Sequence, residues 1–173
     1  MGHVDPLDET VRSVLTDFAD EELDGSWNGR REREAVSLFA FGHLVEQAHT
    51  GGTISDATQI GLEVPVPQVT MDGENGDNKK NQVCKDVVIW PEPRMTCWDE
   101  NQEPTIPPMS IIEWKFDRAS IYGGDVEWLE AFTQQYPDCT GYAVSANQSK
   151  SRFTLSCTRV SDRQTQSEWL YVP

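Results

Sequence analysis

The sequence has little positive charge for its size. Lys and Arg number 14 against 29 Asp and Glu, which gives a formal net charge of -15 over 173 residues. Such a balance excludes a protein that coats nucleic acid through overall charge. The acids are unevenly spread, since residues 1–25 hold eight of them and a single base, Arg12. We therefore expect residues 1–25 to form an acidic, helical N-terminal arm and residues 26–173 to form one folded domain.

The sequence also lacks metal-binding cysteine motifs and long apolar runs. The four cysteines show no CxxC spacing and no paired histidines, which excludes a recognisable zinc site or disulfide framework. No apolar run approaches the ~20 residues that a membrane span needs, and the N-terminus has no signal-peptide pattern. We expect a soluble, cytoplasmic protein with reduced thiols and no membrane partner. There is no GxGxxG, Walker, GxSxG or HExxH motif.

Apolar periodicity predicts a mixed order of helices and strands. Helical spacing covers residues 5–23, 31–49 and 126–136, with Asp125 as the N-cap of the last helix. Strand-like runs follow the pattern of β-branched residues bounded by turn residues, at residues 58–67, 83–91, 110–116, 142–146 and 153–160. Residues 71–82 read as an exposed loop, and the proline-rich residues 91–109 as a long connection. The order predicts an α/β (α+β) domain.

Charged residues interrupt one apolar strand, SIIEWKF at residues 110–116. Strand side chains alternate between faces, so Trp114 and Phe116 can enter a core while Glu113, Lys115 and Asp117 share the opposite face. A solvent-exposed face explains this pattern on its own. However, Asp86 opens the neighbouring run DVVIW and could place a second carboxylate beside Glu113.

Two adjacent carboxylates favour a cation between them. They repel each other and are costly to desolvate unless positive charge is present. Mg²⁺ prefers hard oxygen ligands and commonly uses one or two carboxylates together with substrate phosphate. Lys115, on the same face, would then lie within reach of a water molecule or of the scissile phosphate.

The pattern of Asp86 in KDVVIW followed by Glu113 and Lys115 in IIEWKF resembles the PD-(D/E)xK nuclease superfamily. This resemblance implies a restriction-endonuclease-like mixed sheet flanked by helices, with the order helix, three strands, helix, strand over residues 31–159. It also implies Mg²⁺ (or Mn²⁺) bound by Asp86 and Glu113, and Lys115 as the residue that positions the attacking water. The usual proline before the aspartate is absent, because Lys85 stands there.

A further glutamate on the first helix often completes such a site. We favour Glu34 as a catalytic and metal-binding residue, with Glu32 as the alternative, because helical periodicity does not separate the two. An exposed first turn, with acids stabilised by the helix dipole, explains both as well.

The expected partner is nucleic acid, most simply DNA, and a double-strand cutter of this size would need a homodimer. Local basic zones support this despite the net acidity: Lys79, Lys80 and Lys85 precede Asp86, and Lys150, Arg152 and Arg159 lie in an acid-free stretch. Two alternatives stay open: a non-catalytic nuclease-fold protein that binds nucleic acid or a protein, and an acidic interaction protein that mimics nucleic acid. We expect His43 and Trp114 to be packing residues.

Overall fold

The structure is a computed structural model that describes residues 5–23, 31–69, 81–116, 121, 123–149, 152–162 and 164–173. The described part contains three α-helices: α1 (Pro6–Glu22), α2 (Glu32–Leu38) and α3 (Gly123–Gln135). It also contains six strands: β1 (Ile60–Pro67), β2 (Gln82–Ile89), β3 (Ser110–Phe116), β4 (Thr140–Ser149), β5 (Arg152–Ser161) and β6 (Gln164–Val172). The predicted mixed α/β class is confirmed.

The six strands form one sheet in sequential order, β1-β2-β3-β4-β5-β6. All neighbours pair antiparallel except β3 and β4, which are parallel. A parallel pair cannot be joined by a tight hairpin, and α3 supplies the crossover between these two strands. The β3 and β4 register runs from Ser110 opposite Thr140 to Phe116 opposite Ala146, so β3 is fully paired on that side.

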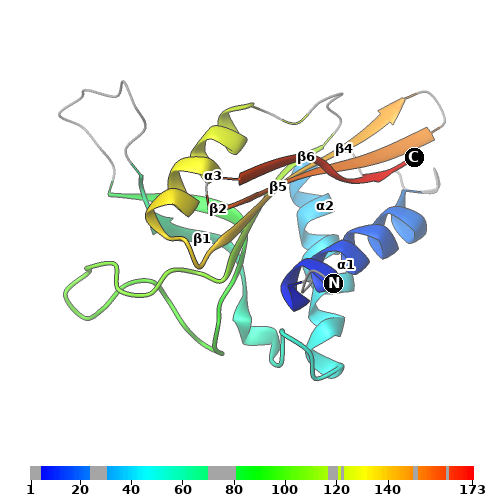
Figure 1. Cartoon of the computed structure of the whole chain (residues 1–173). Helices are drawn as coiled ribbons and strands as arrows, with labels where there is room; N and C mark the ends of the chain where they lie inside the picture. Colours follow the sequence, from blue (N-terminus) through cyan, green and yellow to red (C-terminus); the bar gives the residue numbers. More distant parts are fainter. Residues whose placement is uncertain are drawn as a thin grey trace.

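Helices cover both faces of the sheet (Figure 1). On one face, α1 and α2 pack against Ile112, Trp114 and Phe116 of β3, and Phe18 and Phe39 meet the Trp114 ring edge-on or tilted. On the other face, α3 packs Trp128, Leu129 and Phe132 against the sheet. Because both faces are buried, the polar residues of β3 enter an interior instead of facing water, as an exposed antiparallel sheet would allow.

The acidic N-terminal segment is part of the core. Helix α1 buries its apolar stripe, which consists of Leu7, Val11, Val14, Leu15, Phe18 and Ala19. Asp8 anchors it to the sheet, since one carboxylate oxygen accepts hydrogen bonds from the Tyr142 hydroxyl and from Arg159 Nε, both at 2.6 Å. The helix therefore shares a core with residues beyond 26.

Two regular elements differ from the predictions. The helix expected over residues 31–49 is α-helical only to Leu38, after which the chain widens into a π-helix (Phe39–Leu44) and then tightens into a 3-10 helix (Val45–His49). The wide turn lets four of its residues face the core: Phe39, Ala40, His43 and Leu44. Asp125 lies inside the first turn of α3, which begins at Gly123, so its prediction as an N-cap was wrong.

The prediction missed β6. This strand pairs only with β5 and exposes most of its side chains. Its residues 164–168 are polar and exposed, so its apolar residues are confined to 169–172 and no strand-long pattern reveals it. Its backbone hydrogen bonds to β5 hold it in place. The predicted loop at 71–82 lies mostly outside the described residues, as does Asp117. Across the described residues, no helix has the length and apolar character that crossing a membrane requires.

Replacing Asp8 with Ala should lower the free energy of unfolding by about 3 kcal/mol, because Arg159 would stay buried without its carboxylate. Asp20→Ala is the matched control, since Asp20 is exposed on the same helix, and it should change stability by less than about 0.5 kcal/mol. Urea unfolding measures both variants. Equal stability of the two would mean that α1 is a detachable arm.

Candidate functional site

The site lies where β2 and β3 stop pairing. Their ladder joins Val87 to Ile112, Val88 to Ile111 and Ile89 to Ser110, and goes no further along β2. At the next position, the Asp86 carboxylate accepts the backbone N–H of Trp114 at 2.8 Å. A side chain thus replaces a backbone partner, which holds the two strands together while bringing the Asp86 carboxylate next to Glu113.

Strands β1 and β2 both change face at this point. Leu62 of β1 packs with the core under α1 and α2, whereas Val64, two residues on, packs with the core under α3. In a regular strand, residues two apart share one face. Glu63 lies between them with a φ of 50°, a left-handed conformation that is uncommon for a residue with a Cβ atom. The pairs on either side, Leu62 with Val87 and Val64 with Lys85, keep the same register.

The same change of face in β2 turns Lys85 inward. Val87 belongs to the core under α1 and α2, but Lys85 lies against Trp128 of α3, with its Nζ 3.4 Å from the ring centroid. Lys85 Nζ also forms an ion pair with Glu113 Oε1. The side chains of both residues are 7% exposed, so this is a buried pair.

Glu113 is hard to ionise where it stands. Burial raises the pKa of Glu113 to about 7, and Lys85 opposes this shift without cancelling it. Asp86 raises the pKa further, both by its charge and by a hydrogen bond between the two carboxyl groups that favours the protonated form of Glu113. The predicted meeting of Asp86 with Glu113 is therefore present in the geometry.

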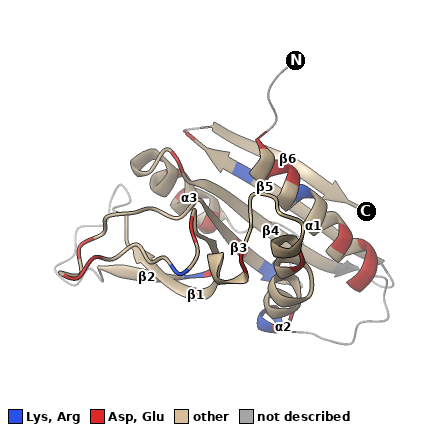
Figure 2. Cartoon of the chain, turned by 90° about the horizontal axis from the view of Figure 1, so that it is seen from below, with Lys and Arg blue, Asp and Glu red and all other residues tan. Residues whose placement is uncertain are grey.

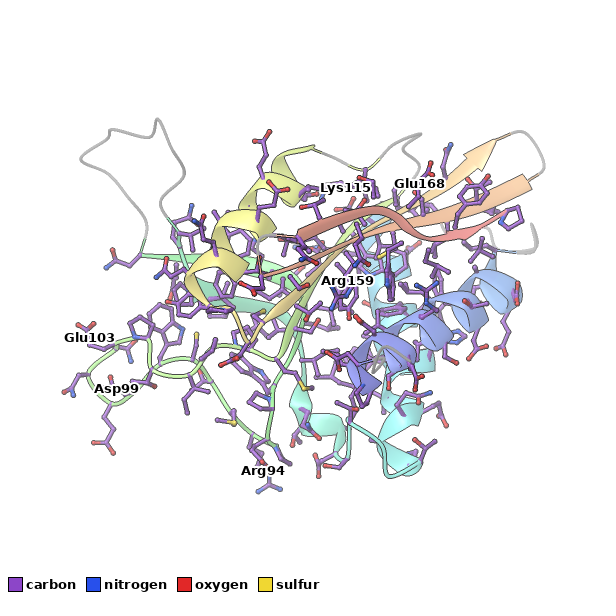
Figure 3. The ribbon with its side chains drawn as sticks, viewed as in Figure 1. Arg94, Asp99, Glu103, Lys115, Arg159 and Glu168 are labelled. Atoms are coloured by element: carbon purple, nitrogen blue, oxygen red, sulfur yellow. The ribbon has the colours of Figure 1, made fainter. Side chains whose placement is uncertain are left out.

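Lys115, which is labelled in Figure 3, is held by acids from two helices. Its Nζ lies 3.2 Å from Asp125 Oδ2 of α3, 4.0 Å from Glu32 Oε1 of α2, and donates to the Trp114 carbonyl at 2.8 Å. Burial disfavours the charged form, but Asp125 and then Glu32 outweigh it and raise the pKa of Lys115. Lys115 thus remains an ammonium at neutral pH, which suits it to neutralise charge or orient water and not to act as a base.

Glu32, and not Glu34, is the helix carboxylate near these groups. Besides approaching Lys115, Glu32 accepts the backbone N–H of Phe116 through Oε2 at 3.3 Å. Glu34 instead lines a groove on the outer side of the helix together with Phe41 and Gly42. Helical spacing explains the difference, because residues two apart on a helix point in different directions. The geometry favours the alternative that the sequence left open.

The site's donors fit a hard divalent cation. Asp86 and Glu113 present carboxylate oxygens, which Mg²⁺ and Mn²⁺ prefer, and the Lys85 ammonium already stands as a cation on Glu113. The whole cluster has four carboxylates, Asp86, Glu113, Glu32 and Asp125, and two ammonium groups, Lys85 and Lys115. When all six are ionised, two negative charges remain in excess.

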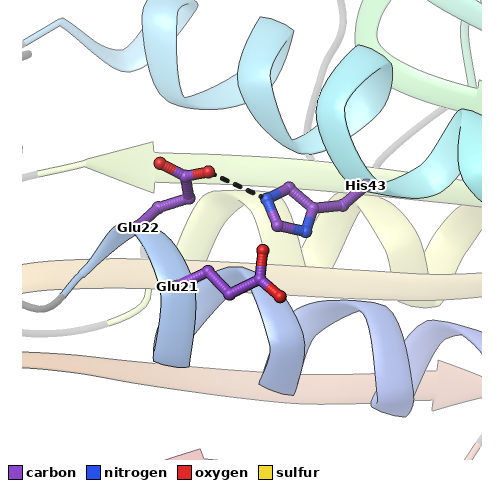
Figure 4. Close-up of side chains that lie close together, drawn as sticks. All are labelled: Glu21, Glu22 and His43. Carbon is purple, nitrogen blue, oxygen red and sulfur yellow. Dashed lines mark hydrogen bonds and ion pairs between the residues drawn. The ribbon is translucent and has the colours of Figure 1, made fainter.

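A different acidic cluster lies at the end of α1 (Figure 4). This cluster consists of Glu21, Glu22 and His43. In the described part of the chain, it is the one place where at least three side chains bring possible metal-ligand atoms close together. His43 Nε2 lies 3.2 Å from Glu22 Oε1, and the imidazole packs edge-on against Phe18. These contacts agree with the packing role expected for His43 and give the cluster a structural explanation.

Three residues of the site were not singled out from the sequence. Lys85 was predicted to be part of a basic stretch and to replace the usual proline, but not to be a partner of Glu113. Asp125 was predicted only as a helix cap, and Trp128 was not singled out. The signal for Lys85 was its place directly before Asp86, where the resemblance expects proline. Lys79, Lys80 and Lys150 lie outside the described residues, and nothing is described of the Arg152 side chain. Arg159 binds Asp8 of α1.

Comparison with known proteins adds no family to this geometry: no family model, curated protein or solved structure matches the chain. The arrangement of the residues therefore carries the functional argument alone.

The raised pKa of Glu113 predicts a pH-dependent contribution to stability. Because the folded state holds the proton more tightly than the unfolded state, this group lowers the free energy of unfolding as pH rises from about 4.5 to about 7. Glu113→Gln should remove that dependence, so the variant's stability relative to the native protein should increase over this range. Urea unfolding at several pH values measures the difference.

The control for this measurement is Glu127→Gln, which removes an exposed carboxylate of α3 and should run parallel to the native protein. If the free energies of unfolding of Glu113→Gln and the native protein differed by the same amount at every pH in this range, the raised pKa of Glu113 would be contradicted.

Proposed function

We propose that the protein is a metal-dependent nuclease with a restriction-endonuclease-like fold that hydrolyses phosphodiester bonds, most simply in DNA. The observation that carries the proposal is the meeting of Asp86, Glu113 and Lys115 where β2 and β3 part. Asp86 acts on both other members, since its charge contributes to the pKa shifts of Glu113 and Lys115.

The element order supports the same proposal. Helix α2, strands β1 to β3, helix α3 and strand β4 follow one another in the order that the superfamily resemblance implies. The residues of the cluster also lie on the elements that the resemblance implies. Asp86 is on the second of these strands, Glu113 and Lys115 are on the third, and Glu32 is on the preceding helix.

The proposed roles follow from chemistry. Asp86 and Glu113 would hold Mg²⁺ or Mn²⁺, which when bound supplies Lewis-acid polarisation and helps generate the nucleophile. Lys115 keeps its charge and is held in place by Asp125 and Glu32, so it can stabilise negative charge that develops on a phosphate. The buried walls from α3 exclude water, which strengthens these electrostatic interactions.

Much of the protein's acidity lies away from the site, although the site itself has four carboxylates against two ammonium groups. Figure 2 shows Asp and Glu positions along α1, and α1 packs on the face of the sheet opposite to α3. Lys85, Glu113 and Asp125 lie on the α3 side, and Glu32 reaches Lys115 from α2. We also propose a cytoplasmic location, as expected from the sequence. The four cysteines are free thiols, which is in keeping with a reducing compartment.

One observation favours a second candidate, a nuclease-fold protein that binds nucleic acid without cutting it. The Lys85 ammonium neutralises Glu113 from within the chain. If that ion pair is permanent, no divalent cation binds, and the site is purely structural.

Cleavage of plasmid, linear and single-stranded DNA and of RNA in Mg²⁺ or Mn²⁺ tests the proposal. Lys115→Ala should reduce the rate about 10²-fold or more, because it removes a cation aimed at developing charge. Arg94→Ala, which removes an exposed cation from the 91–109 connection, should cut at the native rate. Absence of metal-dependent cleavage from the native protein on every substrate would favour the second candidate.

The same assay separates the two helix glutamates. Glu32→Gln should slow cleavage by about tenfold or more, because it loosens the hold on Lys115 and on the Phe116 N–H. Glu34→Gln makes the same chemical change two residues away and should leave the rate near the native value. Equal losses in the two variants, or a larger loss for Glu34→Gln, would overturn the assignment of Glu32.

A further inference from the structure

The two lysines of the site differ in what holds them. Lys115 contacts two carboxylates and a backbone carbonyl, which together fix it at the end of the strand. Lys85 contacts one carboxylate, Glu113, and the face of Trp128. Lys85 is thus the lysine whose ammonium lies directly on a proposed metal-binding oxygen.

A buried ammonium at this place needs an explanation. Its desolvation is costly, and the Trp128 ring and the Glu113 carboxylate offset that cost. The inward position of the Lys85 side chain also depends on the change of face in β1 and β2. The unusual backbone conformation of Glu63 is part of this change. A non-glycine residue in this conformation persists only where the surrounding structure enforces it, and such residues gather at functional sites.

The neighbours of Glu113 show what Lys85 does chemically. Asp86 and Glu113 repel each other, and Lys85 supplies the positive charge that lets the two lie together. A divalent cation would do the same with twice the charge. An ammonium and a metal ion cannot occupy the same carboxylate oxygen, so binding of one excludes the other.

We propose that Lys85 is a resident cation on Glu113 that a divalent metal displaces, and that the displaced ammonium then binds a phosphate of the nucleic acid. This inference rests on the proposed function, because it places the metal at Asp86 and Glu113. It adds a second phosphate-binding lysine, in the position where the superfamily resemblance expects proline. Metal binding and phosphate binding then favour each other, since a free Lys85 needs a new anion.

Chemical labelling of the native protein tests the displacement without any variant. The ion pair and the Trp128 ring should protect Lys85 from acetylation, and saturating Mn²⁺ should raise its labelling severalfold, as measured by mass spectrometry. Mn²⁺ binding is followed separately by electron paramagnetic resonance. The matched control is Glu113→Gln, which should bind Mn²⁺ weakly and show no metal-dependent change at Lys85.

The outcomes distinguish the two proposals. Mn²⁺ binding that depends on Glu113 but leaves Lys85 protected would overturn the displacement and leave the nuclease proposal standing. No Mn²⁺ binding by the native protein would overturn both.

A charge-removing variant gives an independent readout. Lys85→Met keeps an apolar stem against Trp128 and should bind Mn²⁺ about tenfold more tightly than the native protein, because the competing cation is gone. In metal, it should bind a phosphorothioate oligonucleotide more weakly than the native protein by a similar factor, as measured by fluorescence anisotropy. A correctly folded Lys85→Met protein with unchanged or weaker Mn²⁺ affinity would show that the ion pair is only structural. If this variant does not fold, the labelling experiment decides alone.

Discussion

The desolvation of one carboxylate, Glu113, is the constraint on which this structure depends. A charged carboxylate buried under α3 requires a cation within contact distance, and the chain provides Lys85. Lys85 reaches that place only because β2 changes face at Asp86, and β2 can do so in register only because β1 changes face at Glu63. The departure of two strands from regular alternation is therefore explained by the charge that they enclose.

The same cluster ties the two helical layers together. Lys115 stands at the end of β3, where Glu32 reaches it from α2 on one face and Asp125 from α3 on the other. Its partners consequently come from both sides of the sheet, whereas the partners of Lys85 lie on one side. This difference fits the different tasks that we propose for the lysines, with Lys115 held in place and Lys85 exchangeable.

Sequence patterns revealed the strands whose apolar residues run through most of their length and missed β6, where they occupy only one end. The strands through Val87, Ile112 and Phe153 were predicted within a few residues, because their apolar runs are the direct trace of a core. The apolar residues of β6 are confined to 169–172, and the rest of this edge strand is polar and is held by backbone hydrogen bonds to β5. The pairing of Asp86 with Glu113 was predictable from motif spacing. The choice of Glu32 over Glu34 and the inward turn of Lys85 were not, because each depends on a local orientation that simple periodicity gets wrong.

The charge balance of the cluster bears on the order of events in the proposed nuclease. Four carboxylates outnumber two ammonium groups, so a polyanion approaching the bare site meets net repulsion. In the proposed nuclease, a bound divalent cation would cancel that excess and, by displacing Lys85, would also free a positive group for the phosphate. The proposal therefore requires the metal to precede or accompany the nucleic acid. In a protein of net charge -15, where general attraction for nucleic acid is absent, this local change from negative to neutral or positive charge would permit the proposed binding.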